Sequence, residues 1–558
     1  MAENDPRQSV AGKSASGKSG AGKSGSGKSG SGKSGAGKSG SGTSGAVKSG
    51  AGKSGAAEKN GVPAGNTQKP GLSARKLALE ILIKVDSEGA YANLSLNQAF
   101  KRKTLSQQDR AFVTALVQGV VRSKLKLDGT LSKFSSRPLD KMPASLVNVL
   151  RLAVFQIDEM TEIPHSAVLN TSNDLARLTG NAGHPKFVNG VLRSYLRCIE
   201  ANGPEQASND ESSQISAPLS PAGQIPSTAQ ALSLRYSMPE WIVERWLGNF
   251  GAGETEQLLA FANKPPQLVL RTCEMSITTE GLIDILKAKK IAVNRGRLVP
   301  SCLIVEKRPA GPPEKMMGYS EGLYSFQDEA AAFVSLCAEP QKGETIVDLC
   351  AAPGGKALHM GELMENTGRV VAVDVSEKRL GLIKKNRTRL ALTNIETVVA
   401  DGRQYQPAKP ADRVLLDAPC TGTGVIGRRS DLRYRRQPED IRTLAELQKE
   451  LLSNAAAIVK PGGLLIYATC SLEPEENFDN VRWFLKEHQN FEGDSLLHLL
   501  SSEFRSDMAA SEGLDLSEAW KGPMCKTEPE MARVYMIQLM PSRHGVSGFF
   551  VARLRRKD

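Results

Sequence analysis

Six polar residues at or near the ends of five apolar runs are the first candidates for chemistry in this chain. Four are acids and two are cysteines: Asp348, Asp374, Asp401, Asp417, Cys420 and Cys470. A carboxylate accepts hydrogen bonds from ligand hydroxyls, and a cysteine thiolate can act as a nucleophile. A single acid at a strand end could instead cap a helix. Six such positions on five runs make that explanation weak for the whole set.

The five apolar runs are typical of strands in a parallel sheet. They cover residues 345–350, 369–376, 395–401, 413–420 and 464–470, and helix-forming stretches such as 377–392 and 438–459 lie between them. Strands that alternate with helices predict a doubly wound α/β sheet, whose ligands bind at the carboxyl ends of the strands. The acid that ends the second strand, Asp374, is then placed to take the ribose hydroxyls of an adenosine ligand.

The first of these strands leads into a glycine turn, Pro353-Gly354-Gly355, which is followed by helix-forming residues. Glycine lets the backbone approach a ligand closely, and the N-terminus of the next helix offers unpaired N–H groups. The spacing is neither GxGxxG nor GK[ST], so the turn does not fit a dinucleotide fingerprint or a P-loop.

Three longer motifs carry a family resemblance. DLCAAPGGK (348–356), DAPCTGTGVIGRRSDLR (417–433) and YATCSLEPEEN (467–477) resemble the RNA 5-methylcytosine methyltransferases of the Fmu/Sun family. The resemblance implies a Rossmann-like class I methyltransferase domain over residues 336–558, with S-adenosyl-L-methionine as the methyl donor. It implies donor contacts from Cys350, Ala351, Ala352, Pro353, Gly354, Gly355, Lys356, Asp374, Asp401 and Asp417, with Asp374 at the ribose and Asp401 at the adenine edge.

The two cysteines fit the chemistry that this family performs. Carbon 5 of cytosine is a poor nucleophile, but a thiolate that adds to carbon 6 makes it reactive enough to attack an electrophilic methyl group. By the resemblance, Cys470 attacks, Cys420 assists release, and Asp417 lies between donor and base. Enzymes that methylate cytosine in DNA use the Pro-Cys cysteine as nucleophile, here Cys420. An RNA-binding assembly factor with an idle methyltransferase fold is the alternative outside enzymes.

Residues 71–201 are predicted to be helical, with Ser73 and Ser106 as candidate helix caps. The stretch resembles the NusB-like RNA-binding domain that, within the family, marks enzymes acting on the small ribosomal subunit. We therefore expect the substrate to be a specific cytosine of 16S ribosomal RNA, either free or in an assembly particle. We expect the enzyme to be a monomer.

Three further segments are set apart by composition. Residues 1–70 contain a [Ser/Ala]-Gly-Lys-Ser-Gly repeat with almost no apolar side chains, which predicts disorder. This tail carries 11 basic and 3 acidic residues, or +8 of the net charge of +12, so the remainder carries only 12 − 8 = +4. Residues 202–231 are predicted to be a linker, and residues 232–335 a small α/β module packed on the catalytic domain.

The remaining signals concern compartment and surface. No run reaches the roughly 18 apolar residues of a membrane span, and the cysteines form no CxxC pairs, so we expect a cytoplasmic protein without a metal site. Five arginines after Cys420 are expected to face RNA: Arg428, Arg429, Arg433, Arg435 and Arg436. Residues 533–542 and 548–556 are predicted to close the sheet as a hairpin. Ser547 stands where the family usually has Asp.

Overall fold

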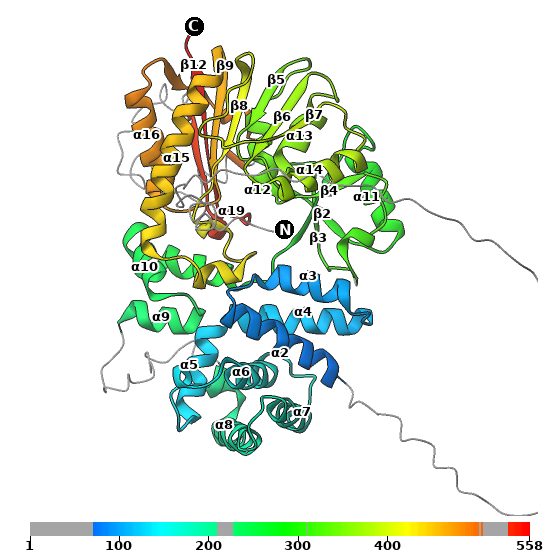
Figure 1. Cartoon of the computed structure of the whole chain (residues 1–558), viewed down its shortest axis with the longest axis vertical. Coiled ribbons are helices and arrows are strands. Elements are labelled where there is room, and N and C mark those ends of the chain that lie inside the picture. The colour runs from blue at the N-terminus through cyan, green and yellow to red at the C-terminus, as the bar shows by residue number, and fades with distance from the viewer. Residues whose placement is uncertain (1–70, 209–226, 310, 501–503, 506–533) are drawn as a thin grey trace, which may run out of the picture. The chain divides into compact units, whose positions relative to one another are not determined.

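The computed structural model describes residues 71–208, 227–309, 311–500, 504–505 and 534–558 (Figure 1). The repeat tail and most of the predicted linker lie outside the described residues. Among the helices that the structure describes, none combines the length and the apolar character that crossing a membrane requires.

The N-terminal part of the described chain is all helical, as predicted. Its helices are α2 (Leu72–Ser87), α3 (Ala92–Arg102), α4 (Gln107–Arg122), α5 (Lys124–Phe134), α6 (Ala144–Glu159), α7 (His165–Arg177) and α8 (His184–Ser208). Helix α6 is the central one, because every residue from Leu146 to Ile157 is buried. The predicted cap at Ser106 is confirmed: its side chain accepts a hydrogen bond from the backbone N–H of Asp109.

Two details of the helical prediction are wrong. Ser73 does not cap α2, because the helix already begins at Leu72, after Gly71 with a left-handed backbone (φ 75°). The predicted linker is also too long at both ends. Helix α8 extends to Ser208, and α9 (Thr228–Tyr236) starts within the predicted linker, capped by Ser227.

The module that follows is a helix pair and a small antiparallel sheet. It comprises α9, α10 (Glu240–Asn263), β1 (Leu268–Thr272), α11 (Thr279–Ala288), β2 (Val293–Arg295), β3 (Cys302–Val305) and β4 (Tyr324–Phe326), with strand order β2-β3-β1-β4. Arg271 on β1 forms a fully buried two-pronged ion pair with Glu362, at 2.5 and 2.9 Å. Because Glu362 lies on a helix of the large sheet, this pair joins the module to that sheet.

The large sheet has eight strands and is mixed. Its elements are α12 (Glu329–Cys337), β5 (Thr345–Asp348), α13 (Gly355–Leu363), β6 (Arg369–Asp374), α14 (Glu377–Arg389), β7 (Ile395–Val399), β8 (Ala411–Asp417), α15 (Pro438–Ile458), β9 (Val459–Thr469), α16 (Phe478–Glu487), β10 (Phe491–Gly493), β11 (Met536–Leu539), α19 (Pro541–His544) and β12 (Phe549–Arg556). The strand order is β10-β12-β9-β8-β5-β6-β7, and β11 also pairs with β12. The five neighbouring strands β9, β8, β5, β6 and β7 run parallel to one another, and β12 runs antiparallel to β9.

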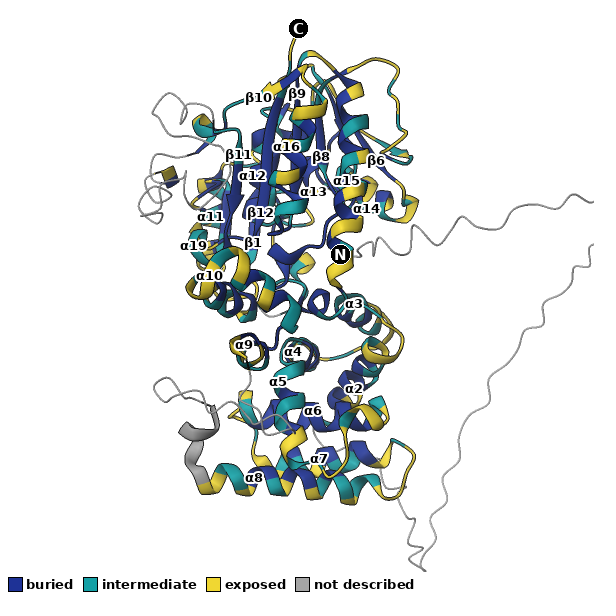
Figure 2. Cartoon of the chain, turned by 90° about the vertical axis from the view of Figure 1, so that its left-hand side faces the viewer, coloured by how far each residue is buried: buried dark blue, intermediate teal, exposed yellow. Residues whose placement is uncertain are grey.

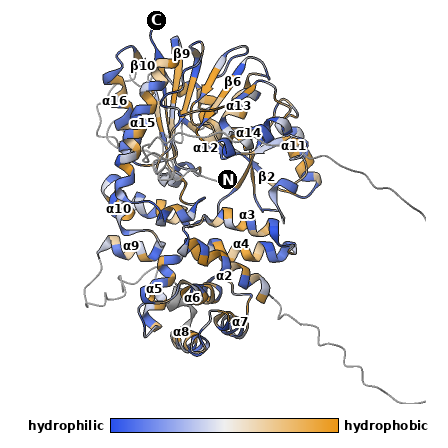
Figure 3. Ribbon diagram, in the orientation of Figure 1, coloured by the Kyte–Doolittle hydropathy of each residue, from blue (hydrophilic) through white to orange (hydrophobic). Residues whose placement is uncertain are grey.

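Alternate residues of the central strands face two separate cores. Ile346 belongs to a cluster with residues of α12, α13 and α14, whereas its neighbour Val347 belongs to a cluster with residues of α15 and α16. This alternation follows from the two-residue period of a strand. The central strands are accordingly buried and hydrophobic (Figures 2 and 3). The predicted Rossmann-like sheet, covered by helices on both faces, is confirmed.

Candidate active site

The first strand of the parallel set ends in a buried acid and a glycine turn. Asp348 is 1% exposed, and neither carboxyl oxygen has a hydrogen-bond partner among the described residues. Burial, with help from nearby Asp417, raises the pKa of Asp348 to about 8. The turn contains a cis Ala352–Pro353 bond, and Gly354 adopts φ 100° directly before α13. A side chain at Gly354 would be strained and would collide with Ile383, which explains the glycine.

The acids after β6 and β7 have different surroundings. Asp374 is 5% exposed and accepts hydrogen bonds from the backbone N–H groups of Ala352 (3.2 Å) and Ser376 (2.8 Å). It therefore ties the glycine turn to the end of β6. Asp401 is partly exposed and accepts hydrogen bonds from the backbone and the guanidinium of Arg403.

Asp417, at the end of β8, is paired with the lysine of the glycine turn. Lys356 Nζ donates to Asp417 Oδ2 at 2.6 Å and lies 5.1 Å from the centre of the Phe549 ring. Burial opposes the charge of Lys356, but the Asp417 carboxylate outweighs it and raises the pKa of the lysine. The predicted contact residues from three strands therefore meet at one edge of the sheet.

The two cysteines of the sequence motifs lie in contact. Cys420 follows β8, Cys470 follows β9, and their Sγ atoms are 3.3 Å apart without a disulfide bond. The parallel pairing of β8 and β9 explains this meeting, because residues 417 and 468 are register partners at the strand ends. Among the described residues, no group of three or more His, Cys, Asp or Glu is placed to hold a metal ion.

The thiols differ in their affinity for protons. A hydrogen bond from Cys420 lowers the pKa of Cys470, and the cations Arg429 and Lys356 act in the same direction. The same hydrogen bond, together with burial, raises the pKa of Cys420 well above its usual value. These two directions favour the thiolate form at Cys470 and the thiol form at Cys420. Burial raises the pKa of Cys350 strongly, so that thiol is no competing nucleophile.

Sequence reasoning missed the buried acid behind the thiol pair. The Glu476 carboxylate accepts hydrogen bonds from the Thr421 backbone N–H (2.9 Å), Gln448 Nε2 (3.0 Å), Ser471 Oγ (2.5 Å) and Thr421 Oγ1. Burial raises the pKa of Glu476 to about 7, although the bonds from Ser471 and Thr421 oppose that shift. Within the motif LEPEEN three glutamates stand close together, and the sequence does not indicate which of them accepts hydrogen bonds from the two cysteine loops.

The expectation that all five arginines face RNA is wrong. Arg433 is fully buried and donates to the backbone oxygens of Arg122, Ser237 and Ala262 and to Asn263 Oδ1, at 3.0–3.2 Å. Arg436 is buried and donates to the backbone oxygens of Thr421 (2.7 Å) and Cys420 (3.1 Å). These two arginines satisfy carbonyl groups inside the protein and are not available to phosphate.

The remaining arginines are also engaged within the chain. Arg435 donates to the Ala90 oxygen at 2.6 Å and stacks on the Tyr91 ring at 3.9 Å. Asp431 accepts from the Ala92 backbone N–H at the start of α3. The loop that begins at Cys420 therefore docks on the helical domain. The charge of Arg429 acts on Cys470 and favours its thiolate form.

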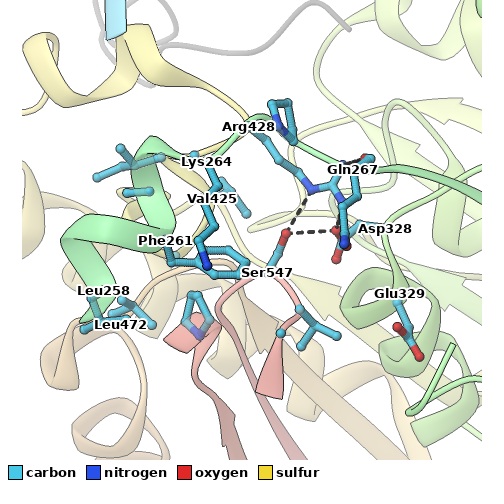
Figure 4. Close-up of a pocket in the computed structure, with 18 of the residues that line it drawn as sticks. Leu258, Phe261, Lys264, Gln267, Asp328, Glu329, Val425, Arg428, Leu472 and Ser547 are labelled. Carbon is cyan, nitrogen blue, oxygen red and sulfur yellow. Dashed lines mark hydrogen bonds and ion pairs between the residues drawn. The ribbon is translucent and has the colours of Figure 1, made fainter. Parts of the chain in front are cut away.

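Arg428 gives a physical account of Ser547. Its guanidinium pairs with Asp328 (2.5 Å), and Ser547 bridges the two, accepting from Arg428 at 3.0 Å and donating to Asp328 at 2.8 Å (Figure 4). These residues line a pocket between α10 and the loop after Cys420, with Phe261, Leu472 and Val425 in its walls. Arg428 therefore has its carboxylate partner in Asp328, and the Ser547 hydroxyl bonds to both residues.

Comparison with known proteins agrees with this architecture part by part. Residues 335–555 match the family described as 16S rRNA methyltransferase RsmB/F, and residues 72–197 match the NusB family. Residues 238–310 match the ferredoxin-like domain of RsmF/B-like methyltransferases.

The similarity to individual relatives extends over most of the chain. The chain is 33% identical over 492 residues to the probable ribosomal RNA small subunit methyltransferase B of Bacillus subtilis (strain 168), which covers 87% of this chain and 99% of that protein. It is 33% identical over 489 residues to the protein of the same name from Synechocystis sp., covering 87% and 100%. The crystal structure of PH0851 superimposes with a TM-score of 0.67 at 27% identity, covering 88% of this chain and 99% of that one. The chain therefore belongs to the 16S rRNA methyltransferase RsmB/F family, an enzyme family of the RNA 5-methylcytosine class.

Proposed function

We propose that this enzyme transfers a methyl group from S-adenosyl-L-methionine to carbon 5 of a specific cytosine in small-subunit ribosomal RNA. Cys470 would form a covalent bond to carbon 6 of that cytosine. The observation that supports this most directly is the thiol pair, 3.3 Å apart, in which the pKa of Cys470 is lowered and that of Cys420 is raised by their hydrogen bond. A methyltransferase acting on an amino group would need no thiolate.

The unequal thiols suggest when each one acts. The Cys470 thiolate adds to carbon 6, which makes carbon 5 nucleophilic, and the donor supplies an electrophilic methyl group. Once the sulfur of Cys470 is bonded to carbon 6, its negative charge is gone. The hydrogen bond to Cys470, the largest cause of the high pKa of Cys420, then disappears. With its pKa lowered, Cys420 can lose its own proton to solvent, and the thiolate so formed takes the proton from carbon 5 while the bond from carbon 6 to sulfur breaks and Cys470 leaves as a thiolate.

The proposed donor site has the chemistry that a sulfonium ligand requires. S-adenosyl-L-methionine is positively charged at sulfur and at its amino group, and Asp348, Asp374 and Asp417 gather three carboxyl groups at one edge of the sheet. Asp348 has two buried oxygens without a partner, as expected for a group that awaits a ligand. We assign the donor to residues 350–356 with Asp374, Asp401 and Asp417, and add Asp348 to that set.

We assign RNA binding to the helical domain, residues 71–201, with help from the module at 232–335. Residues 71–558 together carry a net charge of only 12 − 8 = +4, so we infer that the shape of these surfaces contributes to the selection of the ribosomal RNA.

The test is a denaturing gel with labelled 16S ribosomal RNA and donor. Cys470→Ala should give neither methylation nor a protein–RNA adduct, because nothing can add to carbon 6. Cys420→Ala should still add and transfer the methyl group but stall before release, so an adduct should accumulate. Cys198→Ala, on α8, is the matched control and should behave as the wild type.

Each rival has a distinct signature in the same gel. If Cys420 were the nucleophile, the adduct would appear with Cys470→Ala and not with Cys420→Ala. If the protein were an assembly factor with an idle fold, neither variant would form an adduct and the wild type would not methylate. Either pattern would refute the proposal.

A further inference from the structure

Glu476 is fully buried and makes hydrogen bonds to the loops of both cysteines. Thr421 directly follows Cys420, and Ser471 directly follows Cys470. Both donate to the same carboxylate, Thr421 through its backbone N–H (2.9 Å) and its hydroxyl, and Ser471 through its hydroxyl (2.5 Å). The carboxylate thus bridges the residues immediately beyond each thiol.

The Glu476 bridge lies just beyond the ends of the two strands that precede the cysteines. The strands β8 and β9 end at Asp417 and Thr469, so the regular ladder of backbone hydrogen bonds stops before either cysteine. Gln448, on α15, donates to the Glu476 carboxylate at 3.0 Å and to the Pro419 oxygen at 2.8 Å. The Tyr467 hydroxyl donates to the backbone oxygen of Glu476. Glu476 is therefore itself held in place by Gln448 on α15 and Tyr467 on β9.

The charges around the two thiols are arranged unequally. Arg429 and Lys356 favour a negative charge on Cys470. Glu476, together with Asp417, disfavours a negative charge on Cys420. The other acid that faces Glu476 is Glu473, which forms an ion pair with Arg245 and accepts from Trp246.

We propose that Glu476 is a positioning residue of this site, which holds both cysteine loops in thiol contact and keeps the proton on Cys420, so that Cys470 is the thiolate. The proposal rests on the proposed function, because it gives a reason why Cys470 is the nucleophile. It names a residue that touches neither the donor nor the cytosine and acts only through the thiols.

The test measures the thiols directly and needs neither RNA nor donor. The full chain is alkylated with iodoacetamide at a series of pH values, and modification of Cys470 and Cys420 is followed by peptide mass spectrometry. In the wild type Cys470 should react faster at low pH. Glu476→Gln keeps the shape and removes the charge, so at pH 8 the Cys470-to-Cys420 rate ratio should fall about tenfold, the equivalent of one pKa unit.

Glu475→Gln is the matched control. Glu475 lies in the same turn but pairs with Arg245, and among the described residues no hydrogen bond joins its side chain to the cysteine loops, so its removal should leave the ratio unchanged. A folded Glu476→Gln variant with the wild-type ratio and pH profile would overturn the proposal. If Glu476→Gln does not fold, Ser471→Ala removes the hydrogen bond to Glu476 from the Cys470 side and leaves those that Thr421 donates to Glu476. That variant should lower the ratio to a smaller extent, and an unchanged ratio would equally overturn the proposal.

The result is independent of the adduct gel. A wrong assignment of the nucleophile would show as a reversed adduct pattern, with the alkylation result intact. A wrong assignment of Glu476 would show as an unchanged alkylation ratio, with the adduct pattern intact.

Discussion

The segment after β8 begins with Asp417 and Cys420 and ends with Arg433 and Arg436, and its two ends use polar side chains differently. At the first end, Asp417 remains partly exposed and the thiol of Cys420 contacts only another reactive group. At the far end, the guanidinium groups are buried against backbone carbonyls. The difference teaches that a cluster of charges in a sequence does not identify a surface, whereas side chains at the ends of parallel strands can be placed in advance.

The largest effect is expected at the first end. Cys470→Ala should lower the rate of methylation by about 10⁴-fold or more, because the covalent step has no substitute. The melting temperature should stay at the wild-type value, since the side chain is small and contributes little to the core. Initial rates with tritiated donor, compared with Cys337→Ala as a buried cysteine of the core, check this. A residual rate within tenfold of the wild type would remove Cys470 from the chemistry.

A substitution at the far end of this segment should lower the free energy of unfolding. Arg433→Ala leaves four acceptors without their donor, and we expect a loss of about 2–4 kcal/mol in the free energy of unfolding. Thermal unfolding measures it, with Arg442→Ala, an exposed arginine of α15, as the control. A variant with wild-type stability but weakened RNA binding would show that Arg433 is an RNA contact after all.

The acids at the sheet edge allow a finer comparison. Asp374→Ala should weaken donor binding by about 1–3 kcal/mol, because it removes a ligand acceptor and releases the backbone of the glycine turn. Asp401→Ala should weaken donor binding by a smaller amount, since the Asp401 carboxylate is already paired with Arg403 at a partly exposed position. Calorimetry with the donor measures the affinity of each variant. Equal losses of donor affinity would contradict the predicted difference between Asp374 and Asp401.

The smallest effect concerns pH. The pKa of Asp348 is raised to about 8 in the folded chain, far above about 3.9 in an unfolded one, so its contribution to stability is present at low pH and lost as the pH rises through 8. Asp348→Asn carries no such charge. The ligand-free variant should therefore gain about 1–2 kcal/mol relative to the wild type between pH 7 and pH 9. Denaturant titrations at both values measure it, and a pH-independent difference would exclude a buried, titrating Asp348.

The sequence could place most of the catalytic sheet because its signals are local. Each parallel strand is a short apolar run with an acid or a cysteine at its end, as in Val370–Asp374, and the period of two residues places successive side chains on opposite faces. The family motifs then supplied roles for Cys420 and Cys470, which the structure brings into contact.

The rest depended on partners that are distant in the chain. Arg433 is a buried donor because Arg122 and Ser237 present carbonyl groups to it, and nothing near position 433 announces them. Glu476 is buried because Thr421 and Gln448 reach it from other elements. The error at Ser73 had a different origin, since the left-handed backbone of Gly71 already starts α2 and leaves no place for a cap at Ser73.

The loop between Cys420 and Arg436 also constrains how this protein can evolve. Its residues contact the helical domain at Ala90, the module at Ala262 and the segment after β9 at Cys470, so a substitution there must be compatible with three neighbours at once. An exchange of the helical domain for that of a distant relative would bring foreign carbonyl positions to Arg433 and Arg435. We expect the three parts to have diverged together, and chimaeras to need the matching loop before they fold.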